Sequence, residues 1–155
     1  MTPPAGWPHA SIGAAIAGGL TAHVRAGKLG VVLDSSAGYD LPSGDTVEPD
    51  VSYISTKRFA AGPTPSPGKF LRIVPNLVVE ILSPTTSHRD RTEKKAIYER
   101  NRVDEYWIVD PPRKQLTVFH LGKRSYGVGI TTGVGNVRSR VLPGLALSVK
   151  ELFAV

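Results

Sequence analysis

Apolar residues recur along the chain with two different spacings, which separate helices from strands. From Ile12 to Val24 they fall at helical intervals and predict a helix over residues 9–26. Good helix formers fill 88–101 and predict a second helix. Short runs rich in Val, Ile and aromatic residues predict strands over 30–33, 49–55, 77–82, 105–109 and 115–121. A helix between the strands at 77–82 and 105–109 predicts a right-handed βαβ unit with two parallel strands.

The strand at 77–82 carries one charge, Glu80, inside a run that reads LVVEIL. A run of this composition is typical of a strand buried on both faces. Burying a carboxylate is costly unless it is paired, hydrogen-bonded or bound to a metal. Glu80 is therefore the first candidate functional residue, and a purely structural ion pair is the alternative.

Proline and glycine mark the turns and connections. Residues 57–70 hold the densest cluster of both and predict a long loop, whose basic ends either contact nucleic acid or are simply solvated. The basic residues at and near the ends of this loop are Lys57, Arg58, Lys69 and Arg72.

Three shorter connections complete the pattern. Residues 39–41 are expected to pair with the residues that follow them, and 126–131 with 136–142 as an antiparallel pair. Ser148 and Glu151 have the spacing of a capping box and predict a short terminal helix.

The composition narrows the class of protein. A net charge of +6 and a pI of about 9.8 favour a polyanionic partner, with nucleic acid ranked before an anionic membrane. The chain has no cysteine and no convincing signal or membrane-spanning segment, so we expect a cytoplasmic protein. We expect a lead-in over 1–8 and one domain over 9–155, with an α/β fold in which helices flank a mixed sheet that includes antiparallel hairpins.

A second isolated carboxylate, Asp50, stands at the start of the strand at 49–55. Acidic side chains on adjacent strands can share a divalent cation, and Mg²⁺ uses one or two carboxylates together with water and phosphate oxygens. Such an ion polarises a phosphodiester and activates water, as a nuclease requires. A turn role for the Pro-Asp dipeptide is the alternative for Asp50.

A lysine to orient or activate that water is expected on the returning helix. Glu80 lies roughly 10 Å before the end of its strand, at about 3.3 Å per residue. A helix that begins near 88 covers a similar distance by Lys94, at about 1.5 Å per residue. Asp90 and Tyr98 share the helix face of Lys94, although Asp90 and Lys94 could equally form a surface pair and Tyr98 a packing contact.

The segment PNLVVEILSPTTSHRDRTEKKAIYERNRVDEYWIVDP resembles the core of the Uma-two family of restriction endonucleases, within the PD-(D/E)xK nuclease superfamily. VEPDVSYIS upstream and SRVLPGLALSVKELF downstream are also similar to that family, so the resemblance covers roughly His9 to Phe153. Asp50 matches the family's Pro-Asp acid and Glu80 the acid of its EVLSP-like strand. Asp90, Lys94 and Tyr98 match its helix pattern.

This resemblance implies a restriction-endonuclease-like fold that acts on DNA with Mg²⁺, or Mn²⁺ in its place. Asp50, Glu80 and the backbone carbonyl of Ile81 would bind the metal, with Asp90 and Tyr98 supporting them, and a homodimer without a membrane partner is expected. Two departures stand out. The superfamily lysine position holds Leu82, so Lys94 would replace it, and the usual hairpin before the segment matching His9 is missing.

The leading hypothesis is thus a Mg²⁺-dependent DNA endonuclease in which Asp50, Glu80 and Lys94 carry the reaction. The first alternative is a catalytically inactive nucleic-acid or protein-binding module that keeps the nuclease fold. The second is an enzyme that acts on a different phosphoester, such as RNA.

Overall fold

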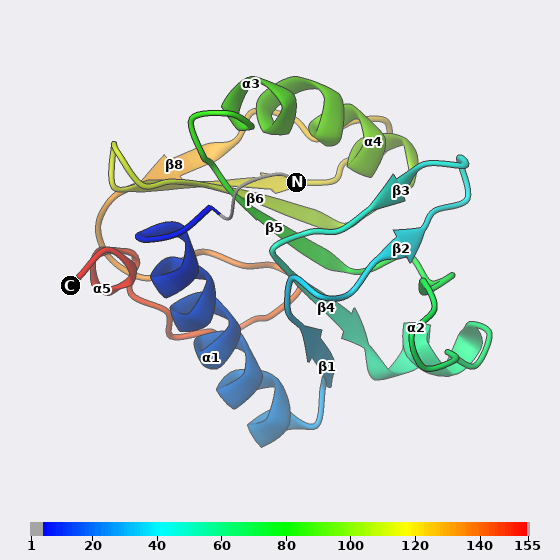
Figure 1. The fold of residues 1–155 in the computed structure, drawn as a ribbon. Coiled ribbons are helices and arrows are strands. Elements are labelled where there is room, and N and C mark those ends of the chain that lie inside the picture. Colours follow the sequence, from blue (N-terminus) through cyan, green and yellow to red (C-terminus); the bar gives the residue numbers. More distant parts are fainter. Residues whose placement is uncertain (1–4, 155) are drawn as a thin grey trace.

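The computed structural model describes residues 5–154 and has a six-stranded sheet at its centre (Figure 1). All neighbouring strands are antiparallel except β5 and β6, which are parallel. The sheet order is β1 (Gly30–Leu33), β4 (Val51–Ser55), β5 (Leu77–Ile81), β6 (Glu105–Asp110), β7 (Gln115–His120) and β8 (Ile130–Thr132). The predicted mixed sheet is confirmed, while residues 1–4 of the predicted lead-in lie outside the described residues.

Helices cover both faces of this sheet (Figure 1). α1 (His9–Gly27) lies on one face, with the short α5 (Val149–Leu152) beside it. The other face carries a continuous helical segment made of α3 (Ser87–Arg89), η1 (Asp90–Lys94) and α4 (Lys95–Arg100). A small hairpin of β2 (Tyr39–Asp40) and β3 (Thr46–Val47) confirms the pairing predicted for 39–41.

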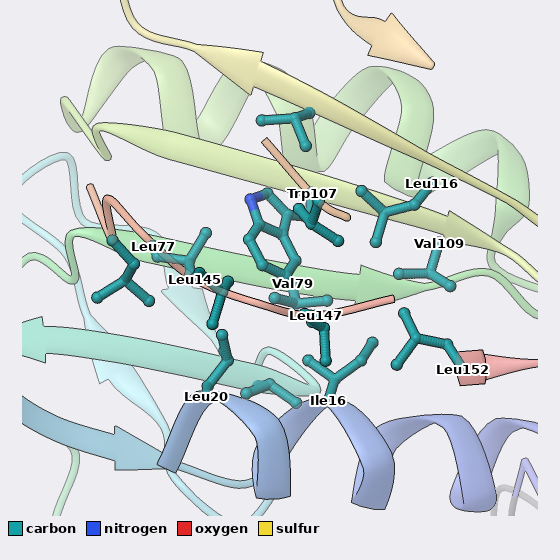
Figure 2. Packing of buried hydrophobic residues seen from close by; sticks show 14 of the residues in the cluster. Ile16, Leu20, Leu77, Val79, Trp107, Val109, Leu116, Leu145, Leu147 and Leu152 are labelled. Atoms are coloured by element: carbon teal, nitrogen blue, oxygen red, sulfur yellow. The ribbon is translucent and has the colours of Figure 1, made fainter. Parts of the chain in front are cut away.

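Alternating side chains of β5 enter two different hydrophobic cores, because successive residues of a strand point to opposite faces. Val79 and Ile81 join the core under α1, whereas Val78 joins the core under α4. Figure 2 shows Ile16 and Leu20 of α1 pointing toward Val79. Glu80 therefore points to the face that α3, η1 and α4 cover.

The buried face of α1 follows the predicted helical spacing. Its fully buried positions repeat every four residues, and the helix ends where Lys28 adopts a left-handed conformation with a φ of 52°. The buried residues are Ile12, Ile16, Leu20 and Val24.

The predicted loop over 57–70 is partly wrong, because its first residues are helical. α2 (Thr56–Ala61) forms where Ser55 accepts a hydrogen bond from the Arg58 backbone N–H at 3.2 Å. An N-cap of this kind satisfies one of the donors that a helix start leaves free. Residues 62–70 contain no helix or strand, and Leu71, which follows them, makes an isolated bridge to Tyr39.

The antiparallel pair predicted for 126–131 and 136–142 is also wrong. Ile130–Thr132 instead pairs with β7 at the edge of the main sheet, and Asn136 makes an isolated bridge to Ser148. Val137 and Leu142 join the core under α1 instead of lining a hairpin, and Figure 2 shows Leu145 and Leu147, which follow them, in the same core. The terminal helix is confirmed, since the Ser148 hydroxyl accepts from the Glu151 N–H at 3.3 Å.

The helix predicted over 88–101 is present with one irregularity, because residues 90–94 form a π-helical turn. In the described part of the chain, no helix is long and apolar enough to cross a membrane.

Candidate active site

The antiparallel register of β4 and β5 brings Asp50 beside Glu80. Val51 pairs with Val79, so the next position along the same register sets Asp50 opposite Glu80. The Ile81 backbone N–H donates to Asp50 Oδ2 at 2.7 Å. This bond fixes the Asp50 carboxylate against β5, one residue from Glu80, and gives the residue a role beyond that of a turn.

Both oxygens of Glu80 are held by side chains from the covering helices. Lys94 Nζ donates to Oε2 at 3.1 Å, and the Tyr98 hydroxyl donates to Oε1 at 2.7 Å. The sequence predicted that Lys94 lies level with Glu80 along the sheet, and the two side chains are in direct contact. Glu80 is only 2% exposed and Tyr98 is fully buried, so the pair forms part of the interior.

Asp90 is a third carboxylate at this site. Its side chain is buried, with Oδ1 3.0 Å from Lys94 Nζ as an ion pair, so Asp90 and Lys94 do not form a surface pair. No hydrogen bond within the described residues reaches this oxygen. The Tyr106 hydroxyl donates to the Asp90 backbone carbonyl at 2.8 Å. That carbonyl lies in the π-helical turn, and such turns are frequent at functional sites.

Three carboxyl groups and one lysine ammonium gather at this site. Lys94 contacts Glu80 and Asp90, and Asp50 lies beside Glu80. Burial raises the pKa of Glu80 to about 8, although Lys94 opposes that rise, and the charge of Asp50 adds to it.

The positive member of the cluster stays charged. Burial alone would lower the pKa of Lys94, but the charges of Glu80 and Asp90 beside it raise it overall. Burial also raises the pKa of Tyr98, so its hydroxyl remains a hydrogen-bond donor to Glu80.

His9 joins the site at the start of α1, with Nε2 3.3 Å from Asp50 Oδ1. The sequence favours a cap or an ordinary surface role for this histidine over ligation, because no third ligand stands at metal-site spacing. Only the packing of α1 across the sheet brings it to Asp50. No local signal in the sequence identifies His9 as a member of the site.

These side chains line a cleft of about 380 Å³ that is open to solvent. The end of β5 and the turn that follows this strand form part of its lining. The lining residues include His9, Glu48, Asp50, Glu80, Asp90 and Lys94.

The carboxylates of Asp50 and Glu80 suit an ion such as Mg²⁺, which needs few protein ligands, better than a metal that is enclosed by protein side chains. Within residues 5–154, no group of three or more His, Asp or Glu side chains could hold a metal ion by itself. Mg²⁺ instead uses one or two carboxylates and leaves its other positions to water and phosphate. Each oxygen of the charged Asp50 and Glu80 carboxylates would keep a further lone pair, and a divalent cation would favour the charged form of Glu80.

The four basic residues at and near the ends of the predicted loop differ in their surroundings. Arg58 is held by Asp104 at 3.0 Å and by two backbone carbonyls, so its guanidinium supports the fold. Lys57 is exposed on α2. Lys69 and Arg72 are exposed and line a hollow of about 530 Å³ together with Phe70.

The fold is similar to that of a solved protein, described as a putative nuclease belonging to DUF820 from Anabaena variabilis. The two share 17% sequence identity with a TM-score of 0.78, over 99% of this chain and 82% of that one. Among curated proteins, a search finds no significant match. The model of the Uma2 family, described as "Putative restriction endonuclease", matches residues 1–150. Because this match spans nearly the whole sequence, the chain belongs to the Uma2 family.

Proposed function

We propose that the protein is a metal-dependent DNA endonuclease in which Asp50 and Glu80 hold Mg²⁺. The observation that carries this proposal is the buried Glu80, next to Asp50 and bonded to Lys94 at 3.1 Å. The backbone carbonyl of Ile81 would be a further ligand, and Mn²⁺ could replace Mg²⁺. When bound, such an ion polarises the phosphodiester and lowers the pKa of a water molecule.

Lys94 would orient or deprotonate the attacking water and stabilise the negative charge that develops on the phosphate. Asp90 keeps the ammonium in place through its ion pair. Tyr98 fixes the second oxygen of Glu80, so the carboxylate cannot rotate freely. Both are positioning residues.

DNA as the substrate rests on the family and on the net charge of +6. The candidate contacts to the phosphate backbone are Lys57, Lys69 and Arg72, while Arg58 would support DNA binding only by stabilising the fold.

Cutting both strands needs two sites, so we also propose a homodimer. Sedimentation equilibrium would then give twice the 16.6 kDa chain mass, and a monomer over the working concentration range would reject it.

Plasmid cleavage tests the proposed reaction. Purified protein incubated with supercoiled plasmid and Mg²⁺ or Mn²⁺ should produce nicked or linear DNA. Glu80→Gln and Asp50→Asn should each reduce the rate by about 100-fold or more, because each removes a charged ligand. Adding EDTA should stop the reaction.

Glu93→Gln is the matched control, since Glu93 is an exposed acid next to Lys94 in η1 but does not line the cleft. It should cut at the wild-type rate. Identical products from wild type and Glu80→Gln would reject the nuclease proposal for DNA. DNA retention that is sensitive to salt but gives no cleavage would favour the binding module instead.

A further inference from the structure

A second hollow, of about 660 Å³, adjoins the candidate active site. It shares four lining residues with the cleft of the candidate site: Ala5, His9, Ser83 and Pro84. A nucleic-acid strand with one phosphate bound near Glu80 could therefore continue into this hollow while it stays in contact with the protein.

The wall of the hollow is built from flat apolar side chains. Trp7 is 70% exposed, which is unusual for the largest apolar side chain. Pro84, Pro111 and Pro112 form other parts of the wall. Proline rings and an indole offer surfaces on which a planar ring can stack.

Polar groups of the same hollow lie where the edge of a planar ligand could meet them. Ser83 and Ser87 offer hydroxyls that donate or accept hydrogen bonds. The carboxylate of Asp110 also lines the hollow, but it is paired with Arg91 at 2.9 Å, so its charge does not repel a phosphate strongly. Lys114 stands with Trp7 at a neighbouring hollow and adds positive charge nearby.

We infer that this hollow binds an unpaired nucleobase next to the phosphodiester to be cut. Trp7 supplies the stacking face, and the substrate is single-stranded DNA or DNA with an unpaired base beside the cleavage position. This inference rests on the proposed nuclease function. The continuity of the two hollows favours a nucleobase over an apolar peptide, because a nucleotide carries both a phosphate for the cleft and a ring for the wall.

Tryptophan fluorescence tests the inference directly. The chain has two tryptophans, and the other one, Trp107, is fully buried, so quenching by a ligand reports on Trp7. Titrating full-length Glu80→Gln in Mg²⁺ with a short oligothymidylate should quench the signal to saturation without cleavage. A blunt duplex of equal length should quench it much less.

Variants at Trp7 give the second readout. Trp7→Leu should bind the oligothymidylate about 5- to 150-fold more weakly, and Trp7→Phe should recover much of that loss. Phe59→Leu, an exposed aromatic on α2, is the control and should bind like the parent. Unchanged affinity in Trp7→Leu, or equal quenching by the duplex, would overturn the inference.

The nucleobase site and the nuclease function can each be rejected without rejecting the other. Saturable quenching by the oligonucleotide in a protein that never cuts DNA would keep the nucleobase site and reject the nuclease. Cleavage of plasmid by a protein whose Trp7→Leu variant binds single strands normally would keep the nuclease and reject the site.

Discussion

Burial and hydrogen bonding have opposite effects on the pKa of Glu80. Its place in a fully buried strand removes water from the carboxylate, which favours the protonated form. Lys94 and Tyr98 each donate a hydrogen bond to it, which favours the charged form. Burial prevails, since the pKa rises to about 8. A carboxylate in this condition gains from a divalent cation, because the cation replaces the solvation that the strand removed.

This balance predicts how the stability of metal-free protein depends on pH. The pKa of Glu80 is raised from 4.5 to about 8, so the folded state holds this proton more tightly than the unfolded state. The Glu80 contribution to the free energy of unfolding should be complete below pH 4.5 and be lost as the pH rises toward 8. The raised pKa of Lys94 acts at higher pH, outside this window.

Urea denaturation in EDTA between pH 5 and pH 8 measures this effect. Wild type should lose stability over that range more steeply than Glu80→Gln, and Mg²⁺ should restore stability to wild type at pH 8. Parallel pH profiles for the two proteins would contradict the assignment to Glu80.

Among the elements, the irregular segment after β8 depends on a single carboxylate of β6. Glu105 is fully buried and accepts hydrogen bonds from four groups, three of which tie residues 139–141 to the sheet. The donors are Trp107 Nε1 at 2.8 Å, the Ser139 hydroxyl at 2.7 Å, the Arg140 backbone N–H at 2.7 Å and the Val141 backbone N–H at 3.4 Å. Buried hydrogen bonds to a charged acceptor are stronger than neutral ones.

Glu105→Gln should therefore lower the free energy of unfolding by about 2–4 kcal/mol. The glutamine amide nitrogen cannot accept, so at least one buried donor loses its partner. The midpoint of urea denaturation measures the change. Glu93→Gln, at an exposed helix position, is the control and should stay close to wild type. Equal midpoints for the two variants would show that Glu105 does not hold the segment.

The whole molecule carries a net charge of +6, but the basic residues are not equivalent. Arg58 and Arg91 are committed to ion pairs with Asp104 and Asp110. Lys69 and Arg72 are exposed around the hollow that includes Phe70 and are therefore the residues proposed to contact DNA phosphates. Long-range attraction depends on the sum of these charges, whereas local binding depends on the exposed ones.

Removing Lys69 and Arg72 together should weaken DNA binding for all sequences alike. The plot of log affinity against log salt concentration should become shallower by about 2, because roughly one counterion is released per phosphate contact. Fluorescence anisotropy with labelled DNA at several salt concentrations measures both quantities. Arg25→Ala with Arg124→Ala removes the same net charge elsewhere, and an equal change in slope there would refute a local contact.

The sequence by itself determined the central part of this protein. Five strands of the main sheet, namely β1, β4, β5, β6 and β7, follow from periodicity, as does α1. The parallel pairing of β5 and β6 and the position of Lys94 level with Glu80 follow from the order of the elements and from distances along the backbone. Such features can be predicted because the pattern that specifies a strand or a helix lies in consecutive residues. That residues 9–155 form one domain, and that Asp50, Glu80 and Lys94 carry out catalysis, stay predictions.

The tertiary structure alone decided which distant residues meet. It brought His9 to Asp50, buried Asp90 at the start of a π-helical turn and placed apolar residues after β8 in the core under α1 instead of in a hairpin. It also set Trp7 in a hollow that adjoins the cleft. None of these contacts leaves a local pattern, because each depends on the free energy of packing whole elements against one another.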